Sequence, residues 1–210
     1  MTSKSRGIVE FAYETGFLKR LPRSGWLTAG VAAPESVAEH SFRTAVLAYL
    51  IASGEGADPE HAAVLGLFHD LPETRIGDVP AAGRAYVKTV APTEVVADQT
   101  AGLPSALAEG IRAAIAEHES AKLPGASLES RCSRDADKLE LLMQAREYQE
   151  AQGNATMQSF VDSMLPLFST DTAKQLAQAA MDTPPAAWWN EFAAKFGTSA
   201  AANRPVRLAK

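Results

Sequence analysis

Four potential metal ligands or proton carriers lie close together in the segment Leu67–Pro80, "LFHDLPETRIGDVP". His69 and Asp70 are adjacent, Glu73 follows three residues later, and Asp78 closes the group. Most of their neighbours are apolar residues, glycine or proline, which favours burial of the group. A buried carboxylate is costly unless a cation or hydrogen-bond donors compensate it. The segment therefore predicts a metal site, a set of proton carriers, or both.

Further ligands of the same chemical types occur elsewhere in the chain. His40 lies in "SVAEHSFRTAVLAYLIA", and Asp135 and Asp137 lie in "SRDADKLELLMQAREYQE". A site of imidazole and carboxylate ligands suits Mn, Co, Zn, Ni or Fe better than the all-oxygen cages that Mg and Ca prefer. A buried histidine is more often a hydrogen-bonded core residue than a ligand, so spacing alone leaves both interpretations open.

A helix is expected to carry His40. Ser36 with Glu39 three residues later is the pattern of a capping box, which predicts a helix that begins at about Val37. His40 then falls in the first turn of this helix, and the face continues through apolar residues at helical spacing.

A second helix is expected to carry the His-Asp pair. Asp58 is a good N-cap residue and Pro59 suits the first helical position, so the helix should run from there to His69 and Asp70. Pro72 lacks a backbone donor and should end or kink this helix. Residues 73–80 are then predicted to form a loop.

The rest of the chain also favours helices, and the predicted fold class is all-α. There is no alternation of strands and helices, no internal repeat and no glycine-rich phosphate loop. Residues 20–35 contain Pro, Gly and Ser and predict an ordered loop. The other helices are expected at residues 4–19, 104–119, 129–152, 154–166, 169–181 and 186–196.

Composition limits the classes of function. The chain has 210 residues, a single cysteine, Cys132, and a net charge of −5. One cysteine excludes an intrachain disulfide and fits a reducing compartment. The acidic balance argues against a nucleic-acid partner. The N-terminal residues lack a signal-peptide core, and no apolar run approaches the roughly 20 residues that span a bilayer. We therefore expect a cytoplasmic protein without a membrane partner.

The blocks "AEH", "FHDLPE", "GDVP" and "DADKLE" occur in this order. Together with "LKRLPRSGW" and "LLMQAREYQE", they resemble the HD-domain metal-dependent phosphohydrolases and, among these, the 5′-deoxynucleotidases. The resemblance covers residues 10–150 and implies a helical bundle with a metal site between its helices. We expect residues 1–185 to form the HD domain with its flanking helices. Residues 186–210 would form a C-terminal extension that is partly flexible.

The resemblance also implies the metal ligands, which are His40, His69, Asp70 and Asp137. Asp137 is preferred to Asp135 because it holds the family's position before Lys138, and Asp135 is then expected at a helix N-terminus. One divalent ion is expected, with Mn, Co, Ni, Zn, Fe and Mg as candidates. A second ion would need further histidines before the last aspartate, where only His118 is available, and His118 is expected to be solvated.

The remaining roles follow from the same resemblance. Glu73 would lie near the attacking water and Asp78 near the deoxyribose, while Arg23 and Trp26 would line the nucleotide pocket. His40 would also bring the positive end of its helix towards the phosphate. Simpler interpretations stay open: Glu73 as a helix-end charge, Asp78 as a turn residue, Arg23 as a solvated cation and Trp26 as part of the core.

The expected activity is hydrolysis of deoxyribonucleoside 5′-monophosphates, so the expected partner is a small nucleotide. One alternative is an HD hydrolase acting on another nucleotide or phosphate ester, and another is a metal-stabilised binding module without turnover. The resemblance further implies a homodimer. Trp188 and Trp189 predict an apolar anchor that packs either on the domain or on a partner subunit.

Overall fold

The structure, a computed structural model, describes residues 3–197 and consists of helices joined by loops. The β-pairing within these residues is one isolated bridge between Pro22 and Ser36. The all-α prediction is confirmed. The expected flexible tail falls mostly on residues 198–210, which lie outside the described part of the chain.

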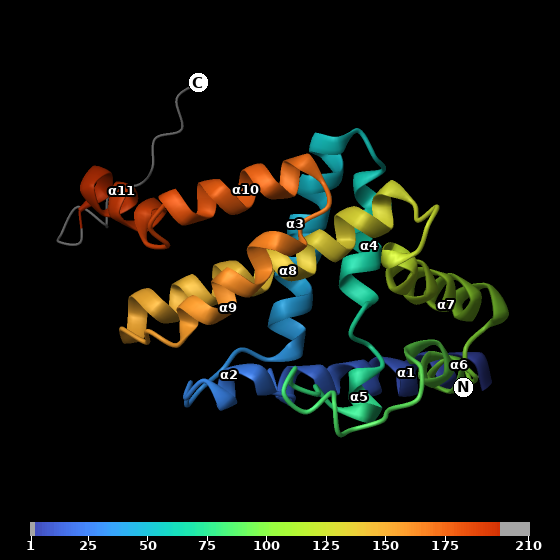
Figure 1. Ribbon diagram of the computed structural model, residues 1–210. Helices are drawn as coiled ribbons and strands as arrows, with labels where there is room; N and C mark the ends of the chain where they lie inside the picture. Colours follow the sequence, from blue (N-terminus) through green and yellow to red (C-terminus); the bar gives the residue numbers. More distant parts are fainter. Residues whose placement is uncertain (1–2, 198–210) are drawn as a thin grey trace.

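Three helices form the centre of the molecule: α3 (Val37–Glu55), α4 (Pro59–Phe68) and α8 (Leu128–Gln152). Figure 1 shows α8 crossing α3 and α4, and each of the three packs against the other two. Their contact buries an apolar core of small and large side chains, among them Ile51 of α3 and Leu142 of α8.

Local sequence signals set the beginnings of α3 and α4. The capping box of Ser36 and Glu39 is present, and α3 begins at Val37. The Asp58 side chain accepts hydrogen bonds from two backbone amides at the start of α4. This helix ends at Phe68, before Pro72. The start of α3 and the start and end of α4 therefore lie close to where the sequence predicts them.

Most of the other predicted helices are also present. The predicted helix 4–19 consists of α1 (Ser3–Thr15) and a 3₁₀ turn (Gly16–Arg20). The remaining predicted helices are α7 (Ser105–Glu119), α9 (Met157–Met164), α10 (Asp171–Asp182) and α11 (Ala187–Phe196). Two short 3₁₀ turns, Ser120–Lys122 and Leu165–Leu167, follow α7 and α9.

Three short helices fall where no helix was predicted: α2 (Ser24–Thr28), α5 (Glu73–Ile76) and α6 (Pro92–Gln99). The predictions of loops at residues 20–35 and 73–80 are wrong where α2 and α5 form within them. Helices α2 and α5 are about one turn long, too short for a periodic pattern. Helix α6 buries Val95 and Val96, and this packing stabilises a segment whose composition is otherwise polar.

One group of helices lies beside the start of α3 and the end of α4. Figure 1 shows α1, α2, α5 and α6 along one side, with α3 and α4 running from there towards α8. A second apolar cluster, which includes Leu18, Val37 and Leu71, joins this side to the start of α3. None of the helices in the described residues combines the length and apolarity needed to cross a membrane.

Candidate metal and nucleotide site

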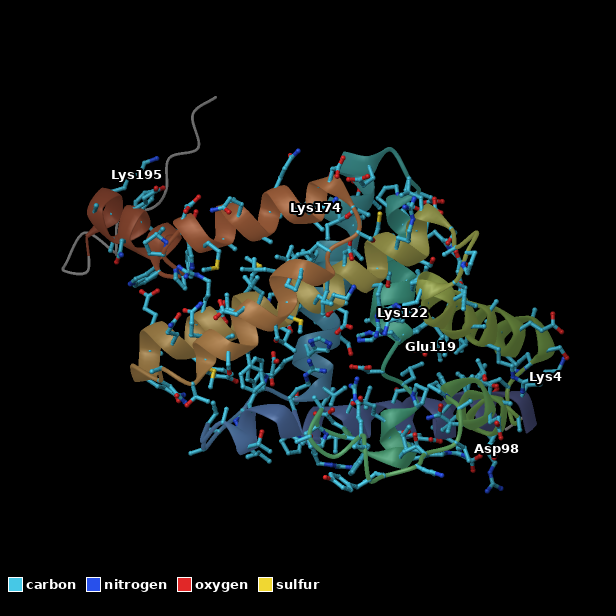
Figure 2. The ribbon with its side chains drawn as sticks, in the orientation of Figure 1. Lys4, Asp98, Glu119, Lys122, Lys174 and Lys195 are labelled. Atoms are coloured by element: carbon cyan, nitrogen blue, oxygen red, sulfur yellow. The ribbon has the colours of Figure 1, made fainter. Side chains whose placement is uncertain are left out.

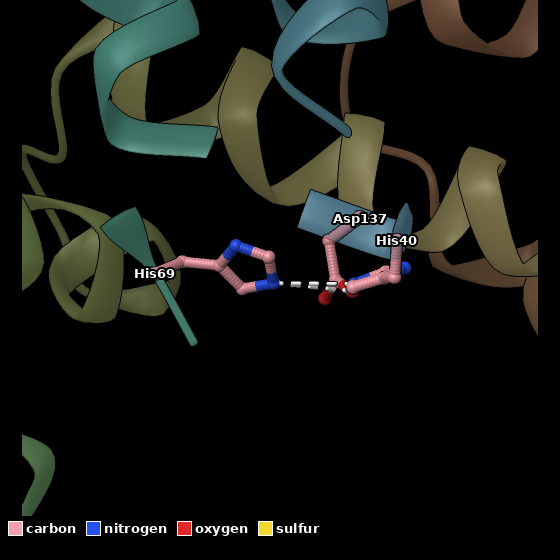
Figure 3. A group of neighbouring side chains, drawn as sticks. All are labelled: His40, His69 and Asp137. Carbon is pink, nitrogen blue, oxygen red and sulfur yellow. Dashed lines mark hydrogen bonds and ion pairs between the residues drawn. The ribbon is translucent and has the colours of Figure 1, made fainter. Parts of the chain in front are cut away.

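Three of the predicted ligands come together from three helices. His40 lies in the first turn of α3, His69 directly after α4, and Asp137 within α8. Their ligand atoms all lie within 4.8 Å of one another. Asp137 Oδ1 is 3.3 Å from His40 Nε2 and 3.8 Å from His69 Nε2, and Figure 3 shows the His69 ring directed at the other two residues.

Asp70, the fourth predicted ligand, borders the same cluster. Its Oδ2 atom lies 3.1 Å from His69 Nε2 and 3.5 Å from His40 Nε2. This oxygen is buried and makes no hydrogen bond within the described residues. A buried carboxylate oxygen without a hydrogen bond is costly, and Arg23 Nη1, 3.5 Å away, is too distant to donate one, so a bound cation would stabilise Asp70.

Hydrogen bonds on the far side of each ring orient the two histidines. His40 Nδ1 lies 2.5 Å from Glu140 Oε2, and His69 Nδ1 lies 2.7 Å from the Gly66 carbonyl oxygen. Since a carboxylate and a carbonyl oxygen both accept, each Nδ1 donates, and each Nε2 faces the cluster, where it can hold either a proton or a metal ion. The two Nε2 atoms are 3.3 Å apart.

The cluster therefore has the electrostatics of a cation site. Burial and the charge of Arg23 lower the pKa of His40, but Glu140 and Asp137 outweigh them and raise it to about 10. A positive charge between the rings and the carboxylates is thus favoured. Two imidazoles and two carboxylates, one with an orphaned oxygen, fit a divalent metal ion.

Glu140 and Arg43 support His40, and sequence reasoning missed both. The Glu140 side chain is fully buried and accepts from Arg43 Nε at 3.0 Å and Nη2 at 2.8 Å through its second oxygen. A carboxylate behind a ligating histidine fixes the ring and raises its basicity. Glu140 lies three residues after Asp137 and between two leucines on the predicted helix. This position was the sequence signal that could have indicated a buried carboxylate beside the ligands.

Replacing Glu140 with glutamine is expected to lower the affinity for a divalent ion about 10- to 100-fold, because His40 loses its carboxylate partner. Isothermal titration of the metal-free protein with Mn²⁺ or Zn²⁺ measures this change. Glu147→Gln is the matched control, since Glu147 binds the same Arg43 at 2.6 Å but is not bonded to His40. Equal metal affinity in both variants would contradict the supporting role.

Glu73 begins α5 and lines the pocket that contains the cluster. Its Oε2 atom is buried without a hydrogen-bond partner in the described residues. Burial, together with the negative charges of Asp70 and Asp78, raises the pKa of Glu73 to about 9. At neutral pH a carboxyl with this pKa is protonated, so Glu73 acts as a base only when a nearby positive charge, such as a bound divalent ion, lowers its pKa again.

Arg23 and Asp78 lie on the same wall of the pocket. Arg23 Nη1 is 3.5 Å from Asp70 Oδ2, and 13% of the Arg23 side chain is exposed, so it is not a solvated cation. Asp78 Oδ2 accepts from the Ser24 backbone amide at 2.6 Å and its hydroxyl at 3.1 Å. Asp78 thus holds the start of α2 beside Arg23 and borders the pocket as well.

Trp26 belongs to both the core and the pocket. It is 1% exposed, and its Nε1 donates to Glu35 Oε1 at 2.9 Å. Its ring lies 5.0 Å from Phe160 of α9 and 5.3 Å from Tyr148 of α8, measured between centroids. The indole therefore supports the wall from the inside, and the two interpretations of Trp26 do not exclude one another.

The pocket is large enough for a nucleotide. Its volume is about 970 Å³, within the usual range for small-molecule sites. One part is lined by apolar side chains of α8, α9 and the turn after α9, namely Leu141, Phe160, Met164 and Leu167. The proposed ligands Asp70 and Asp137 line it too, so one cavity joins the metal cluster to an apolar wall.

Two expectations near the cluster are wrong. His118 is 1% exposed rather than solvated, because α7 packs on α4 and α8; its ring lies 4.9 Å from that of His69 and its Nδ1 2.7 Å from Ser133 Oγ. Asp135 is not at a helix N-terminus, since α8 begins at Leu128, almost two turns earlier. Its fully buried side chain instead accepts from the backbone amides of Ser169 and Thr170, before α10.

Comparison with known proteins agrees with this geometry. Residues 15–180 match the HD domain family, and the chain belongs to that family. It is 31% identical to the 5′-deoxynucleotidase HDDC2 of Bos taurus over 175 residues, 82% of this chain and 83% of the relative. This similarity extends beyond the motif blocks to most of both chains.

Solved structures show the same fold. A conserved hypothetical protein from Pyrococcus furiosus has a TM-score of 0.67 at 28% identity, over 83% of this chain and 99% of the other. The HD phosphohydrolase DatZ of cyanophage S-2L, bound to dA and one catalytic Zn²⁺ ion, has a TM-score of 0.52 over 81% of this chain and 96% of that one. At 18% identity the likeness to DatZ concerns the fold alone.

Proposed function

We propose that the protein is a metal-dependent phosphomonoesterase that converts deoxyribonucleoside 5′-monophosphates into deoxynucleosides and phosphate. The observation that carries this proposal is the convergence of His40, His69, Asp70 and Asp137 in a nucleotide-sized pocket. The 5′-deoxynucleotidase that matches 82% of the chain supports this choice of substrate.

One divalent ion held by His40, His69, Asp70 and Asp137 is part of the proposal. When bound, such an ion supplies positive charge that polarises a phosphate and acidifies water. The chain's own groups provide the rest of the chemistry. His118 Nε2 lies 3.4 Å from Arg134 Nη1, a cation, which favours a single ion over a pair.

Glu73 and Arg23 would act on the reacting phosphate. Glu73 has no structural hydrogen bond at Oε2, so it is available to accept a proton from the attacking water. Arg23 borders Asp70 and can give a phosphate two parallel hydrogen bonds. His40, in the first turn of α3, brings the positive end of that helix to the same place.

Asp78 and Trp26 would position the nucleoside. Asp78 Oδ2 is held by Ser24, so we propose that Oδ1 accepts from the 3′-hydroxyl of the sugar. Phe160, supported from behind by the buried Trp26, gives a rigid aromatic surface on which sugar or base can pack.

Phosphate release tests the activity. The protein would be stripped of metal, reloaded with Mn, Co, Ni, Zn, Fe or Mg, and given all deoxy and ribo 5′-monophosphates, with the 3′-monophosphates as controls. Metal-dependent release from 5′-deoxynucleotides is expected. A preference for ribonucleotides would contradict the role of Asp78 and favour another HD hydrolase. Binding of nucleotide without any release would favour a binding module.

We further propose that the enzyme is a homodimer in which α3 packs against a second copy. Four apolar side chains at helical spacing lie on its outer face and are 44–67% exposed, namely Phe42, Val46, Tyr49 and Leu50. Such a stripe is typical of an interface. Trp188 and Trp189 of α11 are also 70% and 48% exposed, and their rings contact each other with centroids 5.8 Å apart.

Leu50→Asp is expected to convert the dimer into a monomer, because it places a charge within the apolar stripe. Light scattering after size-exclusion chromatography measures the mass. Leu123→Asp is the matched control, since Leu123 is also exposed, at 63% against 52% for Leu50, but lies in the loop before α8. A monomer in the unchanged protein, or a dimer in Leu50→Asp, would contradict the interface.

Two assignments complete the proposal. We propose that residues 1–185 form the catalytic domain and that α11 belongs to a C-terminal extension, consistent with the HD domain match ending at residue 180. We also propose a cytoplasmic location, which the buried free thiol of Cys132 suits.

A further inference from the structure

A row of cations leads away from the proposed metal ligands along α8. Arg131 and Arg134 line the same pocket as Asp137, and the three residues follow one another at intervals of three. Residues at this spacing share a helix face and are separated by about 4.5 Å along the axis. Lys122, at the end of the 3₁₀ turn after α7, also lines this part of the pocket.

These cations lack enough acceptors. Within the described residues, the Nε atoms of Arg131 and Arg134 are buried without a hydrogen-bond partner. Arg134 Nη1 lies 3.4 Å from His118 Nε2 and 3.8 Å from Asp137 Oδ2, while no side chain among residues 3–197 pairs with the Arg131 guanidinium. A buried guanidinium donor without an acceptor is costly, so the row favours an incoming anion.

Nearby carboxylates do not neutralise the row. Glu119 lines the pocket beside Lys122, and Figure 2 shows both near the end of α7, but this residue is exposed and forms no ion pair within the described chain. Lys138, one residue after Asp137, is different because it binds the Leu167 carbonyl oxygen at 3.1 Å and Asp135 at 3.4 Å. Lys138 therefore has its own acceptors and is not counted in the row.

We propose that Arg131, Arg134 and Lys122 form a second anion subsite, which binds a phosphate group next to the one held at the metal ligands. The inference rests on the proposed function, because that function places the first phosphate beside Asp137. The subsite would take the terminal phosphate of a nucleoside 5′-diphosphate or a free inorganic phosphate. Guanidinium groups bind phosphate oxygens in pairs, and three cations that line the same pocket suit the charge of a phosphate group.

The spacing of the row agrees with such a ligand. Neighbouring phosphorus atoms in a diphosphate are closer together than one helical turn, so a second phosphate beside Asp137 reaches Arg134 first and Arg131 next. Arg131 and Arg134 are partly buried in the pocket, and only Lys122 of the three is exposed. A small phosphorylated ligand therefore fits the row better than a nucleic-acid backbone.

Calorimetry with metal-loaded protein tests the subsite. A deoxynucleoside 5′-diphosphate and the corresponding monophosphate would be titrated into Glu73→Gln protein, which is expected to keep the metal without consuming the monophosphate, and into the same protein carrying Arg131→Gln or Lys122→Gln. A bound metal also favours the more highly charged ligand, so the decisive quantity is how the affinity ratio changes. We expect each variant to lower the diphosphate-to-monophosphate ratio about tenfold, which corresponds to the loss of one charge-assisted contact.

Controls separate this effect from folding and from general charge. Lys174→Gln, on the exposed surface of α10, removes the same charge outside the pocket and should keep the ratio. Arg131→Lys keeps the charge, so its diphosphate-to-monophosphate affinity ratio should lie between those of Arg131→Gln and of protein with Arg131 unchanged. Melting temperatures show whether each variant is folded. An unchanged ratio in folded Arg131→Gln and Lys122→Gln would overturn the proposal.

A competition arm identifies the source of the phosphate. If inorganic phosphate weakens binding of the diphosphate but not of the monophosphate, and Arg131→Gln removes this effect, the subsite takes free phosphate. If Arg131 matters only for the diphosphate, the subsite takes an attached phosphate. Hydrolysis of the monophosphate together with a diphosphate-to-monophosphate affinity ratio that does not depend on Arg131 would overturn the subsite alone. Dependence on Arg131 without hydrolysis would overturn the proposed function alone.

Discussion

Asp137→Asn is expected to abolish binding of the divalent ion and to lower phosphate release from deoxynucleoside 5′-monophosphates at least about 1,000-fold. Asp137 Oδ1 is the oxygen that faces both His40 Nε2 and His69 Nε2. Removing its negative charge leaves two imidazoles and Asp70 to hold the metal. Catalysis by a metal ion contributes several kcal/mol to stabilisation of the transition state, and each 1.36 kcal/mol corresponds to a tenfold change in rate.

Asp135→Asn is the matched control for Asp137→Asn, since both aspartates lie on α8 two residues apart. The Asp135 side chain accepts hydrogen bonds from Ser169 and Thr170 and is not part of the ligand cluster. We expect it to lower the free energy of unfolding by about 1–2 kcal/mol, because the turn before α10 loses a charged acceptor. Its metal affinity should remain close to that of the unchanged protein.

Metal titration and thermal unfolding of the two variants therefore give opposite results if the assignment is right. Asp137→Asn should keep its fold and lose the metal, whereas Asp135→Asn should keep the metal and melt earlier. Loss of the metal in Asp135→Asn alone would mean that the wrong aspartate has been assigned as the ligand.

The positions of the histidines could be predicted because local signals determine them. A capping box at Ser36 sets the start of α3, and Asp58 with Pro59 sets the start of α4, so His40 and His69 fall at helix ends. Such signals act within a few residues and can be read without knowledge of the fold. The resemblance to HD-domain phosphohydrolases then indicated which aspartate accompanies them.

The contacts around the cluster could not be predicted, because they join residues far apart in the chain. Asp78 binds Ser24 across 54 residues, and His40 binds Glu140 across 100. His118 appeared polar and exposed in sequence, but packing of α7 against α4 buries it. Burial of a polar side chain depends on which helices pack together, and helix periodicity alone does not provide this information.

Glu73→Gln is expected to lower kcat about 100- to 10,000-fold, the usual range for removal of a general base. Glutamine has nearly the same size but cannot accept a proton from water at neutral pH. The metal affinity should change far less than kcat, because Glu73 is not one of the clustered ligands. Phosphate release in single-turnover experiments and metal titration of the same variant measure the two quantities.

The buried position of Glu73 makes this comparison informative. Its Oε2 atom has no hydrogen-bond partner in the described residues, and neighbouring carboxylates with burial raise its pKa to about 9. A group kept at this cost without a structural bond is expected to serve the reaction. Glu60→Gln, in the exposed first turn of α4, controls for loss of negative charge. Unchanged kcat in Glu73→Gln would assign the base to another group, whereas lost kcat with retained metal would separate catalysis from metal binding.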